Sequence, residues 1–263
     1  IEMGANHVGE INELCQMAQP THGLITNIGY AHTATFGGFE GVIRGKSELF
    51  EYLRTSHGLP FINIEDKVLA NMAKRFKEKI TYPSTDMVFV AAQPMVSYER
   101  AEVTHQTHLL GAYNYMNLAA AYAIGTYFEV KEESIIDAVN NYQSDNMRSQ
   151  LLLKGTNQIL LDAYNANPDS MRVALRSLES FEGDKVAILG DMNELEDSEA
   201  EHFQLLQEAD QMGLRMIITV GPQMALIKGR FPEVRWFGTA TEVTHFVREM
   251  YFEHTAVLIK ASR

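Results

Sequence analysis

The second half of the chain alternates short apolar runs with helical patterns, and this alternation limits the possible fold more than any other feature. Apolar runs at 150–154 and 158–161 flank a Gly-Thr-Asn turn, which predicts a hairpin. Helix–strand repeats follow, with helices expected at 168–181, 198–212, 222–229 and 241–252, and strands at 185–189, 215–220, 234–237 and 255–260. Because strands joined through helices pack as right-handed parallel units, this half is expected to be a Rossmann-like α/β domain.

The first half shows a less regular alternation. Strands are expected at 23–28, 59–64 and within 80–110, and helices at 46–53, from Asp66 onward, at 113–128 and at 132–142, with a glycine-rich loop (Gly37, Gly38, Gly41) before the helix at 46–53. The periodicity stops and polar residues gather at 143–149. We therefore expect two domains, 1–146 and 147–263.

Composition excludes several classes of protein. No apolar run approaches the roughly 18 residues of a membrane span, and the single cysteine, Cys15, cannot build a disulfide scaffold. The formal charge of −12, from 34 acidic and 22 basic residues, argues against a nucleic-acid-binding protein, which would show a basic face. We expect a cytoplasmic protein that binds no nucleic acid and does not insert into a membrane.

Two aspartates follow predicted parallel strands of the second half. Asp162 ends one strand and Asp191 comes just after another, and the carboxyl ends of parallel strands are where α/β sheets bind ligands. Asn167 and Pro168 also suit the start of the next helix, as N-cap and first residue. This segment therefore indicates either a ligand site or simply a well-capped helix.

The first half contains a stretch that imitates a phosphate-binding loop. Gly45, Lys46 and Ser47 occupy the last positions of the pattern G-x-x-x-x-G-K-[ST]. The first position holds Glu40, whose carboxylate would repel phosphate, and the preceding segment 33–38 is not the buried strand that such a loop follows. We reject a P-loop kinase on these grounds.

Other polar residues gain meaning only from their context. Glu2, His32 and Lys46 each lie near the end of an apolar segment or the start of a helix, although a lone histidine is usually structural. Asn114 and Asn117 stand three residues apart and share one helical face, where their amides could recognise the edge of a base. Without further context, polar residues of a first helical turn are the better explanation of this pair.

Taken together, these motifs closely resemble those of the Mur ligase family. The matching stretches are EMGANHVGEI (2–11), NIGYAHTATFGGFEGVIRGKSELF (27–50), GAYNYMNLA (111–119), DAYNANPDSMR (162–172), LGDMNEL (189–195) and LIKASR (258–263). They span both halves in order, so the resemblance covers nearly the whole chain. It implies a partial P-loop-type central ATPase domain followed by a Rossmann-like C-terminal domain.

The resemblance implies a magnesium site in the first half. Glu2 would hold the Mg²⁺ that bridges the ATP phosphates, and His32 would bind a second Mg²⁺. Lys46 matches the lysine that the family carbamylates with CO₂. A carbamate is an anionic oxygen donor, as Mg²⁺ requires.

The resemblance also implies a nucleotide site and an acceptor site. Asn114 and Asn117 match the adenine-binding helix start, and Arg148 and Asp162 match the arginine and ribose-binding aspartate that complete the ATP site. Positions near the acceptor substrate are Tyr164, Asn165, Asn167, Ser170, Lys260, Ser262 and Arg263.

The sequence departs from the family pattern at some positions. Tyr113 stands where the family usually has histidine before the first asparagine, and Ala261 stands where the closing motif has glycine. The family's own phosphate loop lies upstream of the Glu2 motif. We therefore expect this chain to be part of a three-domain ligase, with the phosphate loop and the uridine-nucleotide domain absent.

The function implied by the resemblance is ATP-dependent amide ligation. DAYNANPDSMR together with LGDMNEL is specific to the member that joins D-alanyl-D-alanine to UDP-N-acetylmuramoyl-tripeptide during peptidoglycan precursor synthesis in bacteria, and we expect a monomer. Two alternatives stay open: another amide ligase of the superfamily, similar to folylpolyglutamate synthase, or a nucleotide-binding module without catalysis.

The isolated chain 1–263 is expected to have little or no ligase activity, because the loop that cradles the β- and γ-phosphates is expected to be absent. Phosphate release can be measured with ATP, the UDP-linked tripeptide and D-alanyl-D-alanine. Release at a normal rate that depends on D-alanyl-D-alanine would refute this expectation.

Overall fold

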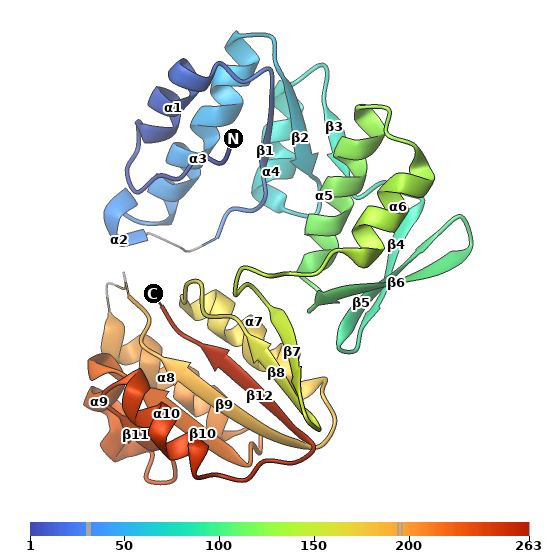
Figure 1. Ribbon diagram of the computed structural model, residues 1–263. Coiled ribbons are helices and arrows are strands. Elements are labelled where there is room, and N and C mark those ends of the chain that lie inside the picture. The colour runs from blue at the N-terminus through green and yellow to red at the C-terminus, as the bar shows by residue number, and fades with distance from the viewer. Residues whose placement is uncertain (30–32, 194, 196, 263) are drawn as a thin grey trace. The chain divides into compact units, whose positions relative to one another are not determined.

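A computed structural model describes residues 1–29, 33–193, 195 and 197–262 (Figure 1). The chain divides into two compact units. Unit 1 comprises Ile1–Ala91, Val96–His108 and Ala112–Tyr142, and unit 2 comprises Ala92–Met95, Leu109–Gly111 and Gln143–Arg263.

Unit 1 contains a parallel sheet covered by helices. Its strands β1 (His22–Ile25), β2 (Leu59–Asn63) and β3 (Ile80–Tyr82) lie in the order β1-β2-β3, with His22 opposite Leu59 and Phe61 opposite Ile80. The helices of this unit are α1 (Glu10–Ala18), α2 (Thr33–Phe36), α3 (Phe39–Thr55), α4 (Lys67–Met72), α5 (Asn114–Tyr127) and α6 (Glu132–Asn141), and a 3₁₀ turn spans Ala73–Arg75. A second sheet has the order β4 (Met87–Ala92), β5 (Met95–Arg100), β6 (Val103–Leu110).

Helix α3 begins earlier than the sequence pattern suggests. It starts at Phe39, so Gly41 and Gly45 lie inside the helix, and the expectation of a loop at Gly41 was wrong. A Cβ atom on Gly41 would lie 1.8 Å from the carbonyl oxygen of Phe36, and one on Gly45 would lie 2.3 Å from its ring. The two glycines are one helical turn apart and let α2 approach α3 closely. The glycines that imitate a phosphate loop therefore serve helix packing.

Unit 2 has the Rossmann-like architecture expected from the alternating pattern. Its sheet has the order β11 (Arg235–Phe237), β10 (Met216–Val220), β9 (Asp184–Gly190), β12 (Thr255–Lys260), β8 (Asn157–Leu161), β7 (Gln150–Lys154). Every pairing is parallel except the β7–β8 hairpin. The helices are α7 (Pro168–Glu179), α8 (Ser198–Asp210), α9 (Pro222–Ile227) and α10 (Ala240–Arg248), and a 3₁₀ turn spans Lys228–Arg230.

The last strand in the sequence lies in the middle of this sheet. β12 pairs with β8 on one side, where Ile259 is opposite Leu161, and with β9 on the other, where Lys260 is opposite Leu189. The residues after three different strands therefore meet at one edge of the sheet.

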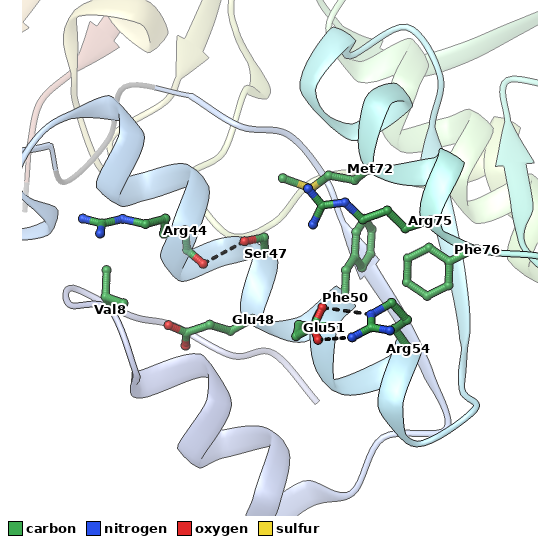
Figure 2. A pocket seen from close by; sticks show the side chains of 10 residues that line it. All are labelled: Val8, Arg44, Ser47, Glu48, Phe50, Glu51, Arg54, Met72, Arg75 and Phe76. Carbon is green, nitrogen blue, oxygen red and sulfur yellow. Dashed lines mark hydrogen bonds and ion pairs between the residues drawn. The ribbon is translucent and has the colours of Figure 1, made fainter.

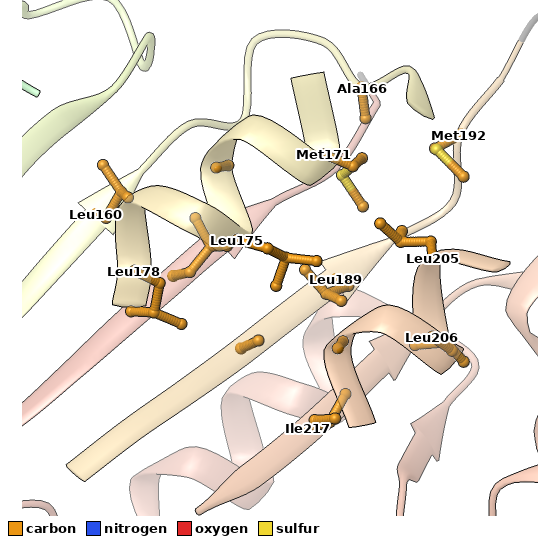
Figure 3. Packing of buried hydrophobic residues seen from close by; sticks show 14 of the residues in the cluster. Leu160, Ala166, Met171, Leu175, Leu178, Leu189, Met192, Leu205, Leu206 and Ile217 are labelled. Atoms are coloured by element: carbon orange, nitrogen blue, oxygen red, sulfur yellow. The ribbon is translucent and has the colours of Figure 1, made fainter. Parts of the chain in front are cut away.

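The core of unit 2 lies between the sheet and its helices. Helix α7 has apolar residues at helical spacing, and Met171, Leu175 and Leu178 are all buried. Figure 3 shows these side chains together with Leu189 of β9 and Leu205 of α8. The packing of the apolar face of α7 against the sheet holds the helix in place. It thereby also holds the loop that precedes α7.

Within the part of the chain that the structure describes, no helix is both long and apolar enough to cross a membrane.

Replacing Leu178 with alanine should destabilise unit 2 by about 2–5 kcal/mol, because Leu178 is 0% exposed and its removal leaves a cavity. Leu153→Ala is the matched control, since Leu153 is 74% exposed and its loss should cost less than about 0.5 kcal/mol. Urea unfolding of both variants measures the difference. Equal losses in the two variants would contradict this packing.

Candidate nucleotide and substrate site

A buried ion pair occupies the carboxyl edge of the unit 2 sheet. The Nζ atom of Lys260 donates to Asp162 Oδ2 at 2.7 Å, to the carbonyl oxygen of Asn165 at 3.0 Å and to that of Asp162 at 3.4 Å. The Lys260 side chain is 1% exposed and the Asp162 side chain 15%. The backbone N–H of Ser149 donates to Asp162 Oδ1 at 3.1 Å, so the carboxylate is held from two sides.

Arg148 and Tyr164 form a second contact in unit 2. The Arg148 guanidinium lies 4.0 Å from the centre of the Tyr164 ring, a cation–π geometry, and both residues are exposed. Met147 and Ser149, on either side of Arg148, have φ angles of 58° and 50°, a left-handed conformation that is unfavourable for these residue types. Ser149 is the residue bonded to Asp162, so Arg148 and Asp162 belong to one connected group.

Asn167 and Ser170 form a capping box at the start of α7. Asn167 Oδ1 accepts a hydrogen bond from the backbone N–H of Ser170 at 2.9 Å, and Ser170 Oγ accepts one from the backbone N–H of Asn167 at 3.1 Å. The side-chain oxygen of Asn165 accepts from the N–H of Ala166. The structure thus shows a well-capped helix at this segment, and it fixes the loop before α7.

Ser262 connects three strand-end segments. Its hydroxyl donates to the carbonyl oxygen of Ala166 at 3.1 Å and accepts from the N–H of Asn193 at 3.0 Å. Its own N–H donates to the carbonyl oxygen of Asp191 at 3.1 Å. The Asp191 carboxylate accepts from the N–H groups at the start of α9, which explains its place after β9 without a ligand. Arg263 lies outside the described residues.

Lys46 lies on α3 in unit 1 and is half-buried. Its Nζ donates to the carbonyl oxygen of Asn27, just after β1, at 3.1 Å. Burial lowers the pKa of the Lys46 amine, and the nearby Asp66 carboxylate partly offsets this. Asp66 also accepts from the N–H of Ile28 at 3.1 Å and caps α4, so it holds the segment that receives the lysine. Its N-cap position was visible in the sequence, whereas its link to Lys46 was not.

The other two expected magnesium ligands are Glu2 and His32. Glu2 is exposed in an irregular segment before α1, and His32 lies outside the described residues. No group of three or more histidine, cysteine, aspartate or glutamate side chains among the described residues is placed to hold a metal. Because an ammonium repels Mg²⁺, the Lys46 position fits the ion only when the lysine carries an oxygen donor.

Asn114 and Asn117 share one face of α5, as their spacing suggests. Asn117 Nδ2 donates to Asn114 Oδ1 at 2.9 Å. Asn114 is buried and Asn117 is exposed. The hydrogen bond to Asn114 fixes the orientation of the Asn117 amide, and Asn117 is the residue of the pair that solvent can reach.

A separate pocket of about 360 Å³ lies in unit 1 (Figure 2). The pocket is lined by residues of α3 and by residues from other segments of unit 1. Those of α3 are Arg44, Ser47, Glu48, Phe50, Glu51 and Arg54, and the others are Val8, Met72, Arg75 and Phe76. It contains none of the expected site residues. The Glu51 and Arg54 side chains pair with each other, as the dashed lines in Figure 2 show.

Both units contain a sheet of parallel strands, and α/β proteins of this class bind ligands outside the carboxyl ends of such strands. The chain matches the Mur ligase middle domain over residues 1–125 and the Mur ligase glutamate ligase domain over residues 147–263. The chain belongs to the Mur ligase family, which confirms the resemblance seen in its motifs and the expected fold class.

Named relatives narrow the comparison. The UDP-N-acetylmuramoyl-tripeptide–D-alanyl-D-alanine ligase of Bacillus subtilis is 34% identical over 209 residues, which are 76% of this chain and 45% of the relative. MurF from Acinetobacter baumannii is 27% identical, with a TM-score of 0.84, over 100% of this chain and 61% of that one. MurF ligase from Thermotoga maritima in complex with ADP shares the fold, with a TM-score of 0.86 at 22% identity over 100% of this chain and 63% of that one. The chain thus spans less than two thirds of each of these proteins.

Asn167→Ala should destabilise unit 2 by about 1 kcal/mol, because the N–H of Ser170 loses its acceptor. Asn167→Asp should retain the stability, since aspartate caps a helix equally well. Thermal unfolding without any ligand measures both variants. An unchanged stability in Asn167→Ala would show that the capping box contributes nothing, and would leave a ligand contact as the reason for this residue.

Proposed function

We propose that the protein acts as an ATP-dependent amide ligase that joins D-alanyl-D-alanine to UDP-N-acetylmuramoyl-tripeptide. The observation that carries this proposal is the presence of both Mur ligase domains in order, with a relative named for that reaction at 34% identity. The domain boundary at 146/147, a bacterial cytoplasmic location and a monomeric state belong to the same proposal.

The proposed reaction has two steps. The terminal carboxylate of the tripeptide attacks the γ-phosphorus of ATP, and ADP leaves, which gives an acyl phosphate. The amine of D-alanyl-D-alanine then attacks the acyl carbon, loses a proton and expels phosphate. The protein has to neutralise charge on the transferring phosphoryl group and exclude water.

Glu2, His32 and Lys46 are the residues that we propose as ligands of two Mg²⁺ ions, with Lys46 carbamylated. Magnesium would supply charge neutralisation at the phosphates. The location of Lys46 supports this role, because α3 holds its Nζ at the segment that follows β1, near the Asp66 carboxylate.

In unit 1, Asn114 and Asn117 are the proposed contacts to the adenine. In unit 2, Asp162 is the proposed contact to the ribose, and Arg148 is a further proposed nucleotide contact. The connected group of Arg148, Ser149 and Asp162 supports the second half of this assignment, since one carboxylate anchors the arginine segment. The ADP bound by the Thermotoga ligase is consistent with ATP as the nucleotide. Tyr164 and Asn165 are exposed and are the proposed contacts to the acceptor, together with Asn167, Ser170 and Arg263.

The test is amide-bond formation by the protein as the cell makes it, with product measured by mass spectrometry. We expect product only when ATP, Mg²⁺ and both substrates are present. Lys46→Ala should reduce the rate by roughly 100-fold or more, because an oxygen ligand of the charge-neutralising Mg²⁺ is lost. Lys67→Ala, at the exposed first residue of α4, is the matched control and should keep the wild-type rate.

Two outcomes would contradict the proposal. Ligation of glutamate to a folate-type substrate, without reaction of D-alanyl-D-alanine, would favour the superfamily alternative. Tight ADP binding with no amide product from any substrate would favour a nucleotide-binding module without catalysis.

A further inference from the structure

The carboxyl end of β12 and the residues that follow it (260–262) bond to two other strand-end segments of unit 2. These are the β8–α7 loop (162–167) and the β9–α8 turn (191–193). Lys260 contacts the first of them, and Ser262 contacts both. The central position of β12 between β8 and β9 makes these contacts possible.

Lys260 has no N–H left for a substrate. Its ammonium group carries three donors, and the structure places three acceptors within hydrogen-bond distance: the Asp162 carboxylate and two carbonyl oxygens of the β8–α7 loop. The side chain is 1% exposed. A buried charge is tolerated only when it is paired, so a substrate contact would require breaking the pair.

Ser262 is engaged in the same way. Its single hydroxyl proton goes to the carbonyl oxygen of Ala166, and its oxygen accepts from Asn193. The hydroxyl thus fixes the distance between the β8–α7 loop and the β9–α8 turn.

We propose that Lys260 and Ser262 are positioning residues that hold the β8–α7 loop, and that they do not touch either substrate. This replaces the acceptor contact expected for both residues, and it rests on the proposed ligase function. Lys260 orients the Asp162 carboxylate, and through Ser149 the same carboxylate holds the segment of Arg148. Lys260 therefore acts on the nucleotide residues and on the Asn165 loop together.

The first measurement is hydrogen exchange in the ligand-free protein, which reports local opening. Lys260→Met should speed exchange in segments 147–150 and 162–167 by about tenfold or more, since their shared anchor is lost. Ser262→Ala should speed exchange only in 162–167 and 191–193. Ser262→Ala removes a single hydroxyl, so it keeps the test valid if Lys260→Met does not fold.

Matched controls come from the same unit. Lys154→Met removes an exposed lysine of β7, and Ser177→Ala removes a hydroxyl that donates to the carbonyl oxygen of Val173 within α7. Both should leave exchange in the three segments unchanged.

The second measurement separates positioning from substrate contact. We expect Ser262→Ala to lower kcat by about tenfold, with the KM values for ATP and D-alanyl-D-alanine within about threefold of wild type. Unchanged exchange, together with a large rise in KM for one substrate, would overturn the proposal. If the wild-type protein as the cell makes it forms no product, the ligase function fails, and the exchange rates alone still decide whether Lys260 and Ser262 hold the loops.

Discussion

The ion pair between Lys260 and Asp162 is the interaction on which the candidate site of unit 2 depends. Removing either partner would leave a charge in a region from which water is largely excluded, and such a charge is costly. The pair is stable because Lys260 also reaches two carbonyl oxygens and Asp162 also accepts from Ser149. A buried polar network of this kind stabilises the fold only when every polar group in it has a hydrogen-bond partner. That requirement fixes the geometry of the loop between β8 and α7.

The alternation of strands and helices was sufficient to predict the fold class, because period and connection length restrict parallel sheets to few arrangements. The sequence did not reveal that β12 inserts between β8 and β9, since strand order is a tertiary property. Without that order, Lys260 and Ser262 could be judged only by motif, and both were expected at the acceptor substrate. The structure shows instead that their polar atoms are used within the protein.

Glycine gave the clearest case in which a local pattern misleads. Gly45-Lys46-Ser47 matches the end of a phosphate loop, yet Gly45 faces the ring of Phe36 inside a helix. The motif could be rejected from Glu40 and from the preceding segment 33–38, because charge and apolar pattern are local properties of the sequence. The role of Gly41 and Gly45 in helix packing could not be found in the sequence, because it depends on how closely α2 and α3 approach each other. Close approach is decided by packing, which no spacing rule describes.

Each unit uses one aspartate to hold the segments that carry its candidate functional groups. In unit 2, Asp162 binds Lys260 and Ser149; in unit 1, Asp66 caps α4 and accepts from Ile28, next to the residue that binds Lys46. A carboxylate has about four acceptor sites. It can therefore accept hydrogen bonds from two backbone segments and still interact with a nearby lysine ammonium group. The nearby aspartate carboxylate explains why a buried or half-buried lysine is tolerated at the sheet edge of each unit. It also means that an aspartate at a strand end is weak evidence for a ligand until its hydrogen bonds are known, as Asp191 shows by capping α9 alone.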